Sequence, residues 1–275
     1  MATSKTAAST AVTKKEAALP AVAFDYGTDA GAGFENTSGK DLSIPFISIL
    51  QSNSPQVEDE NPKGSKPGML FNTVTRELIE GEDGLVFLPA HHEEAFVEWK
   101  PRDAGGGFVG MHDENSEEVQ NAIKAKGTKF AKLTSSAGND LIQTKYMYGL
   151  LLNKEGTESL GFAVISFTST KIKPFTDWLT SMYTLKGKPP LFANRAVLKT
   201  VKQKNEKGTF YNFQIEPFGE NWSKGLINPV EEGALLSEGK DFRQMVISGM
   251  ARASFETQNS TAGAGGEATS EDAPF

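Results

Sequence analysis

The stretch that decides the fold covers residues 174–217 and reads PFTDWLTSMYTLKGKPPLFANRAVLKTVKQKNEKGTFYNFQIEP. Its first part predicts an amphipathic helix over 174–185, because apolar side chains recur at the spacing of one helical face. These side chains are Phe175, Trp178, Leu179 and Met182. Two strand-like segments, 192–202 and 209–217, flank a polar turn and predict a β-hairpin. A helix is therefore followed directly by a two-stranded hairpin.

Strand patterns dominate the residues before this stretch. Leu70–Leu78 and Leu85–Lys100 alternate polar and apolar residues around the break Gly81–Gly84, and we expect them to pair as a hairpin. Tyr146–Leu152 and Leu160–Thr168 form a second predicted pair. The sequence therefore predicts a mainly β domain.

The order of these elements resembles that of a known fold. A last amphipathic helix is predicted over 238–250, with Ser237 as its N-cap, and relative to that fold residues 103–143 would be an insertion. Strands, one helix and a closing hairpin resemble the OB-fold, a five-stranded Greek-key barrel with a helix before its final hairpin. The resemblance implies a mainly β fold with minor α: an OB-like, partly open β-barrel with an inserted segment, a helix before the final hairpin and a C-terminal helix. The face and loops of OB-folds bind oligonucleotides.

Composition divides the chain into three parts. Residues 1–40 are rich in Ala, Ser, Thr, Gly and Lys, and we expect them to be disordered. Residues 41–255 form the predicted OB-like domain, and residues 256–275 a flexible acidic tail. No stretch approaches the ~20 apolar residues of a membrane helix, and no signal peptide is indicated. We therefore expect a soluble, cytoplasmic protein without a membrane partner.

Charge is distributed unevenly, although the chain carries a net charge of only −7. Residues 1–120 carry −11, residues 121–207 carry +10 and residues 208–275 carry −6. A basic centre of this size is an electrostatic footprint for polyanions. A solvated, lysine-rich face is the alternative interpretation.

The residues predicted to bind nucleic acid lie around the helix and the hairpin. Basic side chains that could follow a phosphate backbone are Lys171, Lys173, Lys186, Lys188, Arg195, Lys199, Lys202, Lys204 and Lys207. Phe210 is an aromatic residue on the polar face of its strand, and Phe96 shares a face with Glu94 and Glu98. Stacking of a base on such a ring contributes ~1–3 kcal/mol with little sequence preference. A Phe210 ring covered by another segment is the alternative.

Catalytic and metal chemistry is not indicated. The GxGxxG pattern at Gly105–Gly110 has no βαβ unit around it. His91 and His92 are neighbours on an alternating strand, so we expect them on opposite faces, where they make a poor metal pair. The absence of cysteine excludes disulfides, thiolate nucleophiles and Cys-based zinc sites. We expect no enzyme, cofactor or metal; an enzyme of nucleic-acid metabolism would have to use Asp59-Glu60 or Glu93-Glu94.

The chain ends in an acidic tip that closes on an aromatic residue. Glu271, Asp272, Pro274 and Phe275 suit a groove with an apolar pocket and a basic rim. The tip resembles that of bacterial single-stranded DNA-binding proteins and of some phage counterparts, which implies recruitment of replication and repair proteins. The segments Ile44–Phe46 and Pro67–Asn72 look like those of proteins from tailed phages, which implies the bacterial host cytoplasm.

These observations lead to one main hypothesis. The chain is expected to bind single-stranded DNA without strong sequence preference during replication, recombination or repair, and the sequence does not separate strand annealing from simple coating. The tail is expected to occupy the basic groove when DNA is absent and otherwise to recruit partner proteins. Self-association as a homo-oligomer is left open. The alternative is a phage structural or scaffolding protein without nucleic-acid affinity.

Overall fold

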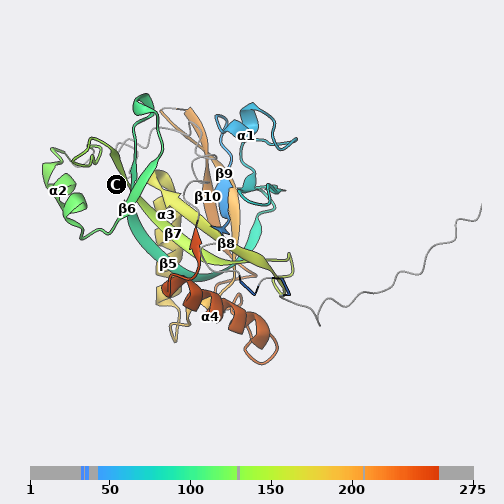
Figure 1. Ribbon diagram of the computed structural model, residues 1–275. Coiled ribbons are helices and arrows are strands. Elements are labelled where there is room, and N and C mark those ends of the chain that lie inside the picture. The colour runs from blue at the N-terminus through green and yellow to red at the C-terminus, as the bar shows by residue number, and fades with distance from the viewer. Residues whose placement is uncertain (1–31, 34, 37–42, 129–130, 207, 254–275) are drawn as a thin grey trace, which may run out of the picture. The chain divides into compact units, whose positions relative to one another are not determined.

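The computed structural model describes residues 32–33, 35–36, 43–128, 131–206 and 208–253 (Figure 1). The chain divides into two units, Met1–Thr37 and Ser38–Phe275, and the account below concerns the second. The predicted tail at 256–275 and most of the predicted disordered segment at 1–40 lie outside the described residues. The disorder of both segments stays a prediction.

A curled sheet forms the body of the second unit. Its strands follow the order β10-β9-β5-β7-β8-β2-β3-β4, and β6 pairs with β5 outside this path. Their bounds are β2 Phe46–Ile49, β3 Leu70–Asn72, β4 Leu78–Ile79, β5 Leu85–Trp99, β6 Phe108–His112, β7 Asp140–Leu152, β8 Ser159–Thr168, β9 Ala196–Asn205 and β10 Gly208–Pro217. A separate parallel pair joins β1 (Ser43–Ile44) to β11 (Arg252–Ala253). The predicted class, mainly β with a partly open, OB-like barrel, is confirmed (Figure 1).

Helices are fewer than strands in the described part of the chain. They are α1 Pro55–Glu58, α2 Glu117–Ala125, α3 Ile172–Thr184 and α4 Gly233–Ile247, with 3-10 turns η2 Arg102–Ala104, η3 Ser169–Lys171 and η4 Leu191–Ala193. The predicted helix at 174–185 is confirmed as α3. The predicted last helix is confirmed as α4, but it begins before Ser237, so the expected N-cap is wrong: Glu232 holds that position.

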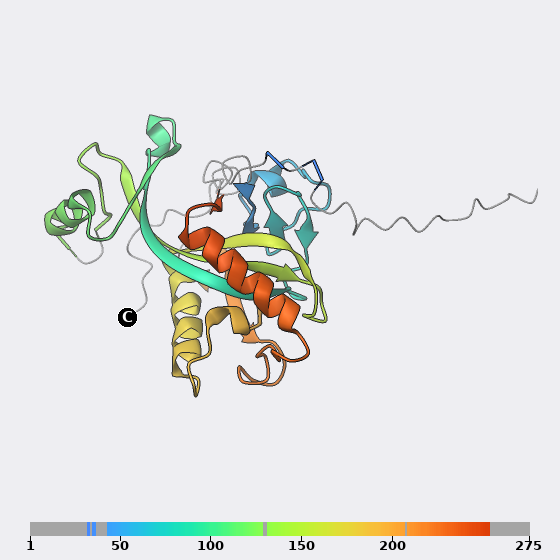
Figure 2. The same ribbon diagram turned by 60° about the horizontal axis from the view of Figure 1, so that its bottom comes forward.

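The central strand β5 is buried on both faces. Leu85 and Phe87 pack into the core that contains Trp178 of α3, whereas Val86 and Leu88 pack into the core that contains Phe242 of α4. Because successive side chains of a strand point to opposite faces, α3 and α4 cover opposite faces of the sheet, and α4 lies across β5 (Figure 2). This two-sided burial fixes both helices relative to the sheet.

One predicted hairpin is wrong and two are confirmed. β7 pairs with β8, and β9 pairs with β10, both antiparallel as expected. The strands β3 and β5 do not pair with each other. Instead β3 pairs with β2 and β4, while β5 pairs with β7, β9 and β6. Alternation identifies a strand and its buried face, but the partner of a long strand is chosen by contacts distant in sequence.

The segment predicted as an insertion contains β6, which pairs with β5 within the sheet, and α2, which lies at the left in Figure 1. Glu98 of β5 is buried and anchors this segment. Its carboxylate accepts hydrogen bonds from the Oγ of Ser135 at 2.7 Å and the Nδ2 of Asn139 at 2.8 Å, and lies 2.7 Å from the Nε2 of His112. Burial raises the pKa of Glu98, but these hydrogen bonds outweigh burial, so the net pKa is lowered.

Arg195 joins the segments around the start of β9. Its side chain is 8% exposed, and its Nη1 lies 2.6 Å from the Oε1 of Glu232. The guanidinium also donates to the carbonyl oxygens of Gly156, Gly225 and Leu226. One buried cation therefore ties the β7–β8 turn and the loop after β10 to the beginning of α4.

Replacing Arg195 with Ala is expected to destabilise the fold by about 3–5 kcal/mol, because it leaves the Glu232 carboxylate without its buried partner. Lys199→Ala is the matched control, since the ion pair of Lys199 with Glu216 has both side chains 35% exposed and such pairs contribute about 0–1 kcal/mol. Urea unfolding of both variants measures the difference. Equal, small losses would contradict the anchoring role of Arg195.

Candidate nucleic-acid interface

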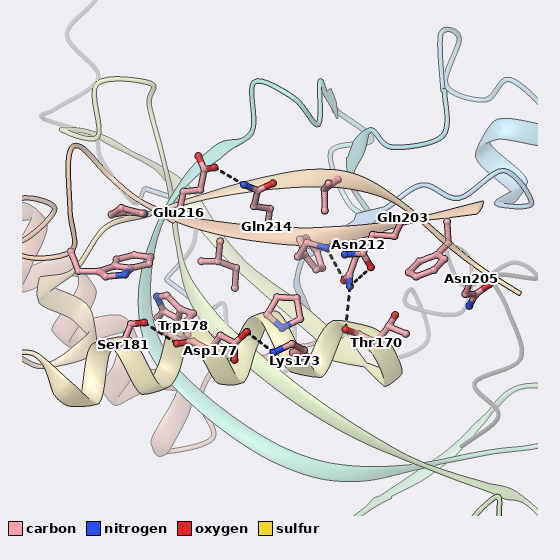
Figure 3. A pocket seen from close by; sticks show the side chains of 17 residues that line it. Thr170, Lys173, Asp177, Trp178, Ser181, Gln203, Asn205, Asn212, Gln214 and Glu216 are labelled. Atoms are coloured by element: carbon pink, nitrogen blue, oxygen red, sulfur yellow. Dashed lines mark hydrogen bonds and ion pairs between the residues drawn. The ribbon is translucent and has the colours of Figure 1, made fainter. Parts of the chain in front are cut away.

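A groove runs between α3 and the β9–β10 hairpin, with a volume of about 750 Å³ (Figure 3). The helix contributes Lys173, Asp177 and Trp178, and the loop after β10 contributes Trp222. The hairpin contributes Val201, Gln203, Asn205, Phe210, Asn212, Phe213, Gln214, Ile215, Glu216 and Pro217. The groove therefore combines amide side chains with aromatic rings, and it brings together the two segments in which the sequence predicted a binding site.

The position of β10 at the end of the sheet creates this groove. β5 pairs with β9 only as far as Leu198, so the rest of the hairpin extends beyond β5. Phe210 pairs with Gln203, and Asn212 pairs with Val201, so these side chains share one face. The Nδ2 of Asn212 donates to the carbonyl of Thr170 at 3.1 Å, which fixes the hairpin against the start of α3.

The free edge of β10 is covered at one end. The Oε1 of Gln51 accepts the backbone N–H of Tyr211 at 2.9 Å, and its Nε2 donates to the Tyr211 carbonyl at 2.8 Å. One glutamine thus satisfies both backbone groups, as a paired strand would. This contact holds the hairpin against the segment that follows β2.

The charges inside the groove are largely paired. Lys173 lies 3.1 Å from Asp177, and Lys199 lies 2.9 Å from Glu216. In the turn before α3, burial lowers the pKa of Lys171 to about 8. The groove floor is therefore nearly neutral, which does not fit the expectation of a strongly basic groove for the acidic tail.

The predicted lysines of the hairpin are separated rather than clustered around Phe210. Lys202 pairs with Tyr211, and Lys204 pairs with Thr209, so both lysines lie on the face opposite to Phe210. Both are exposed, and neither forms an ion pair among the described residues. Lys207 lies outside the described residues. The free positive charge therefore flanks the groove instead of lining it.

Two predicted binding residues are buried. Arg195 is held by Glu232 and by three carbonyl groups, so its guanidinium is not available to a phosphate. Phe96 is 4% exposed, in a strand that has a paired neighbour on each side, β6 and β7; this corrects the expectation of an exposed stacking ring. Phe210 is half-buried and lines the groove.

The remaining predicted lysines lie at the far end of α3. Lys186 and Lys188 follow the helix, about 20 Å from Lys173 if each helical residue adds about 1.5 Å. The Nζ of Lys188 lies 4.2 Å from the ring centre of Tyr183. Neither lysine lines the groove, so they can contact only a ligand that extends along the whole helix.

Three features of the groove were not predicted from the sequence: Trp222, Asp177 and the amide side chains. Trp222 lies in a loop without a periodic pattern, and the loop is placed by Arg195, which bonds to Gly225 and Leu226. The sequence feature that could have identified Trp222 as a site residue is its position as a tryptophan among polar residues. The tail residues Glu271, Asp272, Pro274 and Phe275 lie outside the described residues.

The histidine pair differs from its predicted arrangement. A bulge between Pro89 and His91 breaks the alternation, and the rings of His91 and His92 are stacked with centres 6.3 Å apart. Across the described residues, no group of three or more His, Asp or Glu side chains could hold a metal ion. In the same part of the chain, no helix is long and apolar enough to span a membrane.

Comparison with known proteins gives one family. The Pam3 phage gp34-like protein family matches residues 13–252, which is most of the chain. No curated protein and no solved structure matches the sequence. The matched range includes α3, the hairpin and α4, and therefore the groove residues, and the chain belongs to the Pam3 phage gp34-like family.

Proposed function

We propose that this phage-family protein binds single-stranded DNA with little sequence preference during replication, recombination or repair, and that it is not an enzyme. The observation that carries the proposal is the groove between α3 and the hairpin, whose lining includes Phe210, Trp222 and Lys173. Aromatic rings beside basic side chains are the usual elements of a non-specific single-strand site. The OB-like sheet supports the same function, because strands and loops of such barrels bind oligonucleotides.

The two kinds of contact have different roles in this proposal. Phe210 and Trp222 stack on unpaired bases, whereas a base inside a duplex has no free face to offer. Lys202 and Lys204, outside the groove, attract the phosphate backbone over a longer range. Because Lys173 and Lys199 already pair with carboxylates, they position the strand more than they contribute net attraction.

The tail has a second role. The acidic tip with Pro274 and Phe275 recruits replication or recombination proteins through a pocket with a basic rim. Such recruitment needs the tip to be free while the groove holds DNA, and the distance in sequence between the described core and Phe275 permits this.

The lysine contribution is tested by the double variant Lys202→Glu/Lys204→Glu. We expect its affinity for a single-stranded oligonucleotide to fall about tenfold or more. The slope of log affinity against log salt concentration is expected to become shallower by about 0.7 for each phosphate contact removed. Fluorescence anisotropy across a salt series measures both. Lys154→Glu/Lys240→Glu makes the same charge change at two exposed positions outside the groove, and equal losses in the two variants would exclude the hairpin as the site.

The stacking contribution is tested at Phe210. Phe210→Ala is expected to lose ~1–3 kcal/mol of binding free energy, with an unchanged salt slope, while Phe210→Tyr keeps most of the affinity. Tyr183→Ala removes an aromatic ring that is 68% exposed and lies outside the groove, so it should bind as the unchanged chain does. If Phe210→Ala binds the oligonucleotide as tightly as the unchanged chain, the Phe210 ring is not part of the interface.

Deleting Glu271–Phe275 is expected to leave oligonucleotide affinity equal or slightly tighter, because two carboxylates that repel the phosphate backbone are lost. The same deletion is expected to abolish binding of the recruited replication or recombination protein. Anisotropy measures the first effect and co-purification with host replication proteins the second. A large loss of DNA affinity would contradict the separate roles of groove and tail.

A further inference from the structure

A second recess lies on the other side of the sheet, between β5, η4 and α4. Its volume is about 430 Å³, within the ~300–1,000 Å³ range of small-ligand sites. The residues that line it are Ala90, His91, His92, Pro190, Leu191, Phe192 and Arg243. They form an apolar floor with a basic rim, and none of them is acidic.

The close approach of α4 creates this recess. A Cβ on Gly239 would lie 2.8 Å from the Cδ2 of Leu88 and 3.2 Å from the Cβ of Phe192, so glycine lets the helix pack at this distance without displacing either side chain. Arg243 follows one turn later on the same helix, which places its side chain at the rim. The bulge before His91 adds the two histidine rings.

Arg243 supplies the fixed charge of the recess. It is exposed, and no ion pair of Arg243 occurs among the described residues. Burial, and then the nearby Arg243, lowers the pKa of His91, while burial with His91 and Lys145 lowers that of His92. Both rings are therefore neutral at pH 7, and an anionic ligand with an apolar group meets one cation beside flat, apolar surfaces.

We propose that this recess binds the C-terminal tip of the same chain, with the Phe275 ring on the Leu191–Phe192 floor and the terminal carboxylates at Arg243. The tip complements the recess in charge and in apolar character: it has two acidic residues, a proline and a terminal phenylalanine. The other groove fits it less well, because Asp177 and Glu216 line that groove. The proposal does not depend on DNA binding.

The chain is long enough for this contact. From Arg243 to Ala253, four helical residues and six further residues span at most about 28 Å. The segment from Ala253 to Phe275 reaches ~70 Å when fully extended. The tip can therefore return to the recess beside its own α4. Docking there withdraws the tip from partner proteins and leaves the groove between α3 and β10 open.

The test places a photo-crosslinking residue at the tip of the full chain, as Phe275→p-benzoylphenylalanine. Irradiation followed by peptide mass spectrometry is expected to find crosslinks to the peptides that contain His91 or Phe192, within a monomer. Arg243→Glu is expected to reduce the yield about tenfold, since a charge-assisted contact is replaced by repulsion. Lys240→Glu makes the same charge change on the same helix outside the recess and should leave the yield unchanged.

Several outcomes would overturn the proposal. Crosslinks to Phe210 or Trp222 would place the tip in the other groove, and a crosslinked dimer would assign it to a second copy. An unchanged yield in Arg243→Glu, with unchanged Tm in both variants, would exclude the recess. If Arg243→Glu weakened oligonucleotide binding, the recess would belong to the nucleic-acid interface; unchanged oligonucleotide binding keeps this result separate from the proposed function.

Discussion

The burial of both faces of β5 is the constraint on which the rest of the structure depends. Alternate side chains from Leu85 to Leu88 enter two separate cores, one closed by α3 and the other by α4. A fully buried Leu or Phe stabilises the fold by about 1.5–3 kcal/mol, so neither helix can move away without exposing a whole core. Both candidate sites follow from this arrangement, because each lies at the margin of one helix.

The two sites differ in the chemistry that the helices bring to them. On the α3 side, the hairpin projects past β5, and its amide and aromatic side chains face a helix whose charges are paired. On the α4 side, a close contact at Gly239 brings Arg243, which forms no ion pair with any residue that the structure describes, beside an apolar floor. Shape and stacking therefore dominate the first site, and charge complementarity dominates the second. Under the two proposals, the DNA strand and the tail tip would therefore use separate surfaces and would not compete.

Elements that depend on residues close in sequence were predicted correctly from local sequence patterns. The α3 helix followed from the spacing of Phe175, Trp178 and Met182, all of which are buried, and the β9–β10 hairpin followed from its turn. The errors concern long-range contacts. Phe96 is buried in a strand that pairs with β6, a pairing that was not predicted, and Arg195 contacts Glu232, which lies in a segment without periodicity. Residue type alone could not distinguish an arginine that binds phosphate from one that holds a loop, nor foresee the bulge that brings His91 and His92 together.

The central claim is that the groove holds an unpaired nucleic-acid strand. Its most direct test is fluorescence anisotropy of the unchanged protein with labelled single-stranded and duplex oligonucleotides of one sequence across a salt series. The account predicts binding to the single strand that weakens steeply with salt, with much weaker binding to the duplex, whose bases cannot stack on Phe210 or Trp222. Absence of single-strand binding at low salt would contradict it and would favour a phage structural or assembly protein.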